Sequence, residues 1–260
     1  MITTKSPREI EYMREAGRIV ALAHEAIMPY MKEGVTTRQI EEICEKTILA
    51  HNATPSFKGL YGFKGAVCTS INSTLVHGIP SNVKLKNGDI ISVDIGACYH
   101  GYHGDSAWTY AIGDVDEKTL DLMKVTHEAL FEGLKYAKAG NHLSDISHAI
   151  GEYVMQHGYS VPSDYTGHGI GTSVHEDPDV PNFGPAGRGV ILKEGMTIAV
   201  EPMVHAGKPQ TRTLSDGWSV VTKDGSMCAH YEHTIVIQKD GYEILTEIQG
   251  GTSKEWLNKM

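Results

Sequence analysis

Two aspartates, Asp94 and Asp105, lie in a stretch whose pattern predicts a pair of β-strands. Apolar residues alternate with others around Asp94, and the alternation returns beyond Asp105 after two glycines. Antiparallel pairing of such strands would bring the two carboxylates close together. Because two ionised carboxylates at short range repel, one would take up a proton unless a cation lay beside them. The hairpin from Asp89 to Tyr110 therefore favours a cation site and raises the question of further ligands.

Three further side chains with ligand chemistry stand at strand ends or between glycines. Glu201 closes one apolar run, Glu232 opens another, and His168 lies between two glycines that let the backbone pass close to a neighbour. Each alone has a bland explanation, such as a solvated strand end. Together with Asp94 and Asp105 they offer one nitrogen and several oxygens. Since carboxylates can bridge, the set carries enough negative charge for two divalent cations.

Composition excludes several classes of protein. The chain of 260 residues has a formal charge of −9 and no long basic run, which argues against direct nucleic-acid recognition. Its four cysteines are widely spaced without a C-x-x-C pair, which fits a reducing compartment rather than a disulfide framework. The N-terminus lacks an apolar signal core, and no apolar run approaches the ~18 residues of a membrane span. We expect a soluble, cytoplasmic protein without a membrane partner.

The elements that must position these side chains fall into a repeated order. Helical spacing with start and stop residues predicts two helices before the strand block and two after it. A final hairpin is predicted from Trp218 to Ile237. The repeated order suggests two similar halves in one domain, residues 1–260, of α+β class: a curved antiparallel sheet with helices outside. The expected helices are residues 6–28, 38–51, 116–137 and 143–157.

The order and spacing of the motifs resemble the methionine aminopeptidases of type I. The resemblance runs over essentially the whole chain and rests on separate blocks in the family's order. It implies the pita-bread fold, a curved antiparallel sheet covered by helices in two pseudo-symmetric halves. The matching blocks are Asp94 with Asp105, Gly-His168-Gly-Ile-Gly, His175-Glu-Asp-Pro, Glu201-Pro, Tyr-Glu232-His-Thr and His77-Gly-Ile-Pro.

The resemblance implies a dinuclear metal site. Asp105 and Glu232 match the positions that bridge the two ions. Oxygen-rich ligation with one imidazole is compatible with Co, Mn, Fe or Zn. The implied ligands are Asp94, Asp105, His168, Glu201 and Glu232.

The resemblance also implies roles in amide hydrolysis. Glu201 would accept a proton from the attacking water and pass it to the leaving amine. His175 would hydrogen-bond the scissile carbonyl and the developing oxyanion, and His77 would contact the backbone nitrogen beyond the scissile bond. Apolar side chains would hold the methionine, with Phe57 standing where many bacterial members carry a smaller residue. The implied pocket residues are Cys68, Phe63, Phe57 and Trp218.

The implied reaction is removal of the N-terminal methionine from nascent proteins whose second residue is small and uncharged. Its partners would be peptides with N-terminal methionine, nascent chains and the nearby ribosome, and the family's habit is a monomer. Two rivals remain. Prolidases and proline-specific aminopeptidases share the five ligands but generally carry an extra N-terminal domain, for which we expect no room. A non-catalytic binding protein on the same scaffold would have lost ligands, whereas all five are present here.

Overall fold

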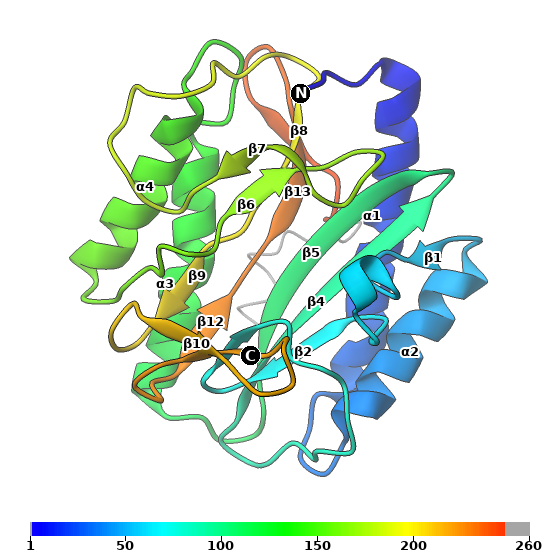
Figure 1. The fold of residues 1–260 in the computed structure, drawn as a ribbon, viewed down its shortest axis with the longest axis vertical. Coiled ribbons are helices and arrows are strands. Elements are labelled where there is room, and N and C mark those ends of the chain that lie inside the picture. The colour runs from blue at the N-terminus through cyan, green and yellow to red at the C-terminus, as the bar shows by residue number, and fades with distance from the viewer. Residues whose placement is uncertain (1, 248–260) are drawn as a thin grey trace.

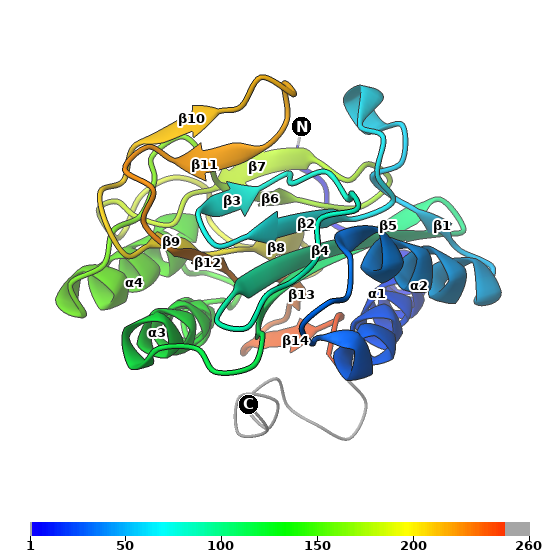
Figure 2. The same cartoon turned by 90° about the horizontal axis from the view of Figure 1, so that it is seen from below.

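Two pairs of helices cover one side of a set of antiparallel sheets in the computed structural model, which describes residues 2–247 (Figure 1). Viewed from below, the helices lie on the same side of the strands (Figure 2). The sequence predicted each of the four α-helices to within a few residues at either end. The helices are α1 (Pro7–Ile27), α2 (Thr37–Ala50), α3 (Glu117–Leu134) and α4 (Leu143–Gln156), with short 3₁₀ turns η1 (Met28–Tyr30) and η2 (Leu60–Gly62).

Local capping explains where the first two helices begin. The Ser6 side chain accepts a hydrogen bond from the backbone of Glu9, whose carboxylate accepts one from the Ser6 backbone, and Pro7 occupies the first turn. Thr36 and Gln39 form the same reciprocal pair at the start of α2. The sequence therefore specifies both starting points without help from the rest of the fold.

A long hairpin forms the centre of the N-terminal half. Strands β4 (Ile90–Tyr99) and β5 (Tyr102–Ala111) pair over ten residues each, as the alternation predicted. The turn residues His100 and Gly101 have φ values of 49° and 82°, the left-handed conformation that a tight two-residue hairpin requires. Helix α1 packs against both strands. On the other edge of β4 lie β1 (Thr54–Pro55) and β2 (Cys68–Ile71).

The C-terminal half contains a five-stranded antiparallel sheet in the order β14-β13-β8-β6-β7. Two smaller sheets lie beside the two main ones, with the orders β10-β11-β3 and β12-β9. The five strands are β6 (Gly167–Gly169), β7 (Glu176–Val180), β8 (Thr197–Val200), β13 (His233–Ile237) and β14 (Tyr242–Ile244). The remaining strands are β3 (Thr74–Val76), β9 (Met203–His205), β10 (Thr211–Thr213), β11 (Val220–Thr222) and β12 (Cys228–His230).

The predicted hairpin from Trp218 to Ile237 is wrong. That stretch forms β11, β12 and β13, and each of the three pairs in a different sheet. Alternation indicates that a segment is extended, but it does not say which distant segment will be its neighbour. The α+β class with antiparallel sheets and outer helices is confirmed.

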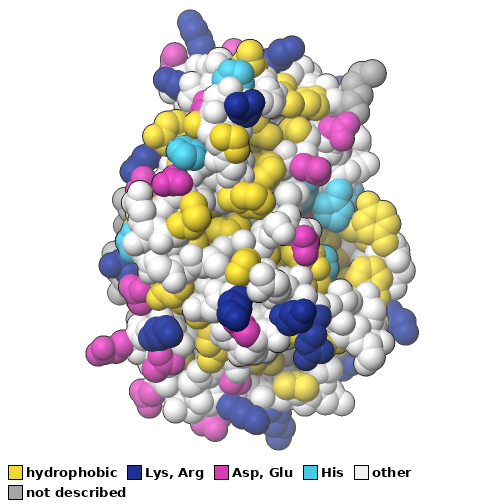
Figure 3. Space-filling view, turned by 60° about the vertical axis from the view of Figure 1, so that its left-hand side comes forward, with side chains coloured by type: hydrophobic (Ala, Val, Ile, Leu, Met, Phe, Trp, Pro, Cys, Tyr) yellow, Lys and Arg dark blue, Asp and Glu magenta, His cyan; other side chains and the backbone are white. Residues whose placement is uncertain are grey.

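On the face drawn in Figure 3, acidic and basic side chains are interspersed around apolar ones, and charges of one sign do not gather in a patch. None of the helices in residues 2–247 combines the length and the apolar character needed to cross a bilayer. Below the surface, one large cluster of buried apolar side chains joins the helices to the main sheets.

Candidate active site

One cavity of about 630 Å³ brings together all the side chains that the sequence singled out for chemistry. Carboxylates and imidazoles line one part of it, and aromatic and sulfur-containing side chains line another. The predicted residues that border it are Asp94, Asp105, His168, Glu201, Glu232, His77, His175, Cys68, Phe63, Phe57 and Trp218.

The hairpin register places two of the carboxylates. Asp94 pairs with Ala107, whereas Asp105 pairs with Gly96, so the two aspartates are diagonal neighbours on one face of the β4–β5 ladder. The prediction that antiparallel pairing would bring them together is confirmed. On the other side of β4, Cys68 pairs with Asp94, which brings the thiol to the same wall of the cavity.

Glycines on both sides of His168 are required by close backbone packing. A Cβ at Gly167 would collide with the carbonyl oxygen of Ala199 on β8, and one at Gly169 would collide with that of Asp177 on β7. The glycines therefore let β6 fit between its neighbours and present the imidazole to the cavity. This is the close approach that the Gly-His-Gly pattern predicted.

Hydrogen bonds between the two halves hold the backbone of Glu232 beside the hairpin. The Glu232 amide donates to the Ala107 carbonyl (2.8 Å), and the Ser106 hydroxyl donates to the Glu232 carbonyl (2.6 Å). The Thr234 hydroxyl accepts from the Asp105 amide (3.0 Å) and donates to the Asp105 carbonyl (2.8 Å). The backbones that carry Asp105 and Glu232 are thus tied directly to each other.

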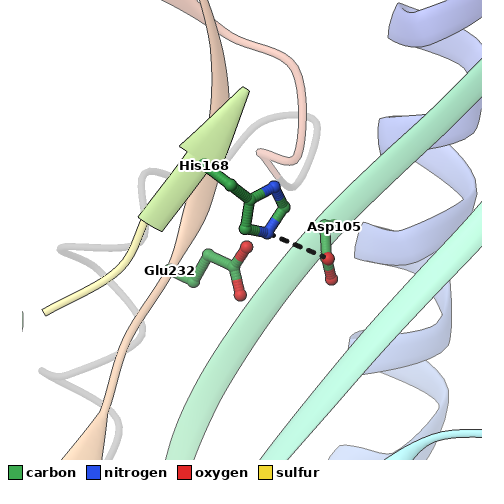
Figure 4. Close-up of side chains that lie close together, drawn as sticks. All are labelled: Asp105, His168 and Glu232. Carbon is green, nitrogen blue, oxygen red and sulfur yellow. Dashed lines mark ion pairs between the residues drawn. The ribbon is translucent and has the colours of Figure 1, made fainter. Parts of the chain in front are cut away.

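The ligand atoms converge in two overlapping groups. Asp105, His168 and Glu232 come from β5, β6 and the segment before β13, and they point toward one another (Figure 4). The Nε2 atom of His168 lies 3.9 Å from Asp105 Oδ2 and 3.4 Å from Glu201 Oε1. The second group consists of Glu201, Glu232 and His230. In each group the ligand atoms lie within 4.8 Å of one another.

Burial changes the proton affinity of the cluster. It raises the pKa of Asp94 to about 6 and holds the pKa of Asp105, Glu201 and Glu232 well above the usual range of carboxyl groups, with the neighbouring carboxylates adding to the effect for Asp105 and Glu232. Burial lowers the pKa of His168 to about 4, so this imidazole is neutral and able to bind a metal.

The donor set fits a divalent metal centre. Within residues 2–247, one carboxylate oxygen each of Asp94, Asp105 and Glu232 is buried without a hydrogen-bond partner. Buried carboxylates normally have such partners, because leaving one unpaired is costly. A cation would satisfy these oxygens and remove the repulsion that raises the pKa values of the acids.

The apolar wall is built from packed rings and a neutral thiol. The rings of Phe63 and Trp218 meet edge to face with centroids 5.1 Å apart. The Phe57 ring covers Gly96, where a Cβ would collide with it. Burial, reinforced by the nearby carboxylates, holds the pKa of the Cys68 thiol well above its usual value. Cys68 therefore stays protonated and lines the cavity as a neutral side chain, and it does not serve as a thiolate ligand.

Two histidines outside the ligand cluster also face the cavity. The ring of His175 lies 4.5 Å from that of His168 and 6.0 Å from that of Tyr61. Burial lowers the pKa of His175 and brings that of His77 to about 4. Both imidazoles are therefore neutral near pH 7, and each carries one N–H that can donate a hydrogen bond.

Some cavity residues were missed by the sequence reasoning. Tyr165 and Met203 line the cavity but belong to no ligand-like pattern, so only the fold reveals them. His230 did leave a signal: it precedes Glu232 by two residues, the spacing that puts two side chains on one face of an extended segment.

Comparison with known proteins identifies the class to which this fold and site belong. The profile of Metallopeptidase family M24 matches residues 11–239, and the chain therefore belongs to this metallopeptidase family. Within the family the chain groups with the methionine aminopeptidases. It is 52% identical to methionine aminopeptidase 1 of Bacillus subtilis over 95% of this chain and 100% of the relative, and 43% identical to methionine aminopeptidase of Escherichia coli over 94% of each.

Solved structures agree with this placement. The crystal structure of methionine aminopeptidase from Thermotoga maritima superposes with a TM-score of 0.93 at 46% identity, covering 95% of this chain and 99% of that one. The prolidase from Pyrococcus furiosus gives a TM-score of 0.78 at 24% identity, with 95% of this chain and 66% of that chain covered. The latter likeness concerns the fold alone. The pita-bread fold predicted from the sequence is confirmed.

Proposed function

We propose that this metallopeptidase removes the N-terminal methionine from peptides and nascent proteins. The observation that carries the proposal is one cavity in which a buried cluster of carboxylates and imidazole adjoins an apolar wall. The first part has the chemistry to hydrolyse an amide, and the second has the shape and polarity to hold an unbranched thioether. The names of the similar proteins support the same reaction.

We propose that the centre holds two divalent ions, because its charge matches theirs. Four carboxylates and one imidazole balance two divalent cations, and Asp105 and Glu232 are the proposed shared ligands. When bound, such ions supply Lewis-acid activation of water and of the substrate carbonyl. Co, Mn, Fe and Zn all suit these donors. The proposed ligands are Asp94, Asp105, His168, Glu201 and Glu232.

Protein side chains would carry the proton and stabilise developing charge. Glu201 is the proposed general base, which accepts a proton from the attacking water and returns it to the leaving amine. Its side chain belongs to the proposed ligand cluster and, although only 10% exposed, still borders the cavity. His175 would donate its single N–H to the scissile carbonyl, where negative charge grows.

The rest of the cavity would select the substrate. Phe57, Phe63, Cys68 and Trp218 would enclose the methionine side chain, since sulfur and aromatic rings attract each other. His77 would contact the backbone nitrogen beyond the scissile bond. We further propose that crowding beyond this point admits only a small, uncharged second residue.

The setting of the reaction follows from the same proposal. We propose one catalytic domain over residues 1–260 that acts as a monomer in the cytoplasm. Its substrates there would be nascent chains near the ribosome, whose N-terminal methionine is still in place.

A panel of short peptides tests the proposed function. Purified protein is loaded with Co(II), and release of the first amino acid is measured from Met-Ala-Ser, Met-Lys-Ser and Ala-Pro. The proposal predicts rapid release of methionine from Met-Ala-Ser, little from Met-Lys-Ser and no cleavage of Ala-Pro. Preferred cleavage of Ala-Pro would instead assign the cavity to the prolidase reaction.

A further inference from the structure

His230 lies inside the metal cluster although no role has been assigned to it. It is the last residue of β12, is only 1% exposed and borders the cavity. Its Nε2 atom is 3.3 Å from Oε2 of Glu201 and 3.8 Å from Oε2 of Glu232. The imidazole thus reaches both C-terminal carboxylates of the centre.

These short distances are not hydrogen bonds. Within residues 2–247, the buried Nε2 atom of His230 has no hydrogen-bond partner, because the Glu232 oxygen is too distant and the nearer Glu201 oxygen does not meet hydrogen-bond geometry. A buried polar atom left in this state costs about 1–3 kcal/mol in general. The ring is therefore placed beside two acids without satisfying either of them directly.

The spacing suits three ligands of one ion. Tetrahedral ligand atoms at about 2.0–2.2 Å from a metal are separated from each other by about 3.3–3.6 Å. The distance from His230 Nε2 to Glu201 (3.3 Å) falls in this interval, and the distance to Glu232 (3.8 Å) lies just above it. An ion between the three side chains would accept the nitrogen lone pair and oxygens of both carboxylates.

The backbone of His230 is fixed from the N-terminal half. Its amide donates to the Thr109 hydroxyl (3.0 Å), which in turn donates to the His230 carbonyl (2.8 Å). The Tyr231 hydroxyl donates to the Thr109 carbonyl (3.0 Å). These bonds fix the backbone that carries the imidazole before any ion binds, which is the kind of support that ligand sites require.

We propose that His230 is a sixth ligand of the centre and binds, through Nε2, an ion shared with Glu201 and Glu232. This inference rests on the proposed dinuclear site and extends it. The centre then has an imidazole on two sides, His168 and His230. A second nitrogen donor shifts the preference of the site toward Co, Fe and Zn and away from Mg, which favours oxygen ligands.

Proton NMR of the Co(II)-loaded protein tests the assignment without relying on activity. An imidazole bound to paramagnetic Co(II) through one nitrogen shows its other, exchangeable N–H far outside the normal spectrum. With two ions bound per chain, we expect two such resonances. His230→Gln should remove one and weaken binding of an ion at least about 10-fold, while circular dichroism stays unchanged. His148→Gln, on helix α4, should remove neither.

The outcomes separate this inference from the proposed function. Two bound ions with one shifted N–H, insensitive to His230→Gln, would overturn the sixth ligand while leaving methionine release intact. A chain that binds only one ion would also overturn it. Two shifted resonances in a protein that releases no methionine would support the ligand and contradict the function. If the variant fails to fold, the number of shifted N–H resonances in the unaltered protein decides whether His230 is a ligand: two support it and one contradicts it.

Discussion

The two halves of the molecule hold their cavity-facing carboxylates in different ways. Asp94 and Asp105 sit within an unbroken ladder of ten paired residues on each strand. Glu201 comes directly after β8, and Glu232 lies in the break between β12 and β13. The N-terminal acids are thus placed by strand register, whereas the C-terminal acids stand where regular pairing stops.

The difference shows that the N-terminal half supports a carboxylate of the C-terminal half. A side chain at a strand end lacks a paired neighbour on one side, so other contacts must fix it. Glu232 obtains them from Ser106 and Ala107 on the hairpin, and the Glu201 carbonyl accepts a hydrogen bond from Asn182 (2.9 Å). Glu232 therefore depends on bonds that reach across the molecule, and substitutions at or near it should disturb the centre most.

Removal of the Glu232 carboxylate should have the largest effect. Glu232→Ala is expected to lose at least one metal and to lower kcat/KM by more than about 100-fold, because even residues that only support a ligand cost about 10–100-fold in affinity. Elemental analysis and peptide kinetics check this. Glu243→Ala on β14 is the control and should keep both ions. Two ions retained by Glu232→Ala would rule out bridging.

Loss of His175 should separate chemistry from metal binding. His175→Ala is expected to keep its metal but to lose about 10²-fold in kcat, the usual cost of removing one oxyanion donor. The variant is compared with the unaltered enzyme by kinetics and metal content. Turnover close to that of the unaltered enzyme would refute the proposed role.

A smaller effect should follow from cutting the link between halves. Thr234→Val leaves the Asp105 amide and carbonyl without their side-chain partner. We expect a loss of about 1–3 kcal/mol in the free energy of unfolding and about 10-fold weaker metal binding. Thr126→Val, which removes a buried hydroxyl within α3, is the control and should affect stability alone. Equal metal affinity in the two variants would show that the link does not position the ligands.

The smallest effect concerns pH. In the metal-free protein the pKa of Asp94 is raised from 3.8 to about 6, and the pKa values of Asp105, Glu201 and Glu232 are also raised. The folded state then binds more protons than the unfolded state, so these groups reduce stability as pH rises through that interval. Bound metal ions would offset this loss of stability, because they stabilise the ionised carboxylates. The Tm difference between metal-loaded and chelated protein should widen by several degrees from about pH 5 to about pH 7.5. A difference that narrows instead would contradict the assignment of these pKa shifts.

Local patterns in the sequence predicted one half better than the other. The helices and the β4–β5 hairpin follow from caps and alternation between residues close in sequence. The pairing of β11, β12 and β13 does not, since it joins segments far apart in the chain. Asp94 and Asp105 stood out by themselves, but Glu201 and Glu232 gained meaning only as members of a set. His230 was missed because its approach to Glu201 depends on how β12 pairs with β9, the strand that follows Glu201 in the chain.

The most direct test of the account is methionine release during metal restoration. The protein is stripped with a chelator, and Co(II) is added back stepwise while bound metal and hydrolysis of Met-Ala-Ser are measured together. We expect no activity in the stripped protein and a rise to a plateau as the ligand cluster fills. Full activity in the stripped protein, or no methionine release after both ions have bound, would contradict a metal-dependent aminopeptidase.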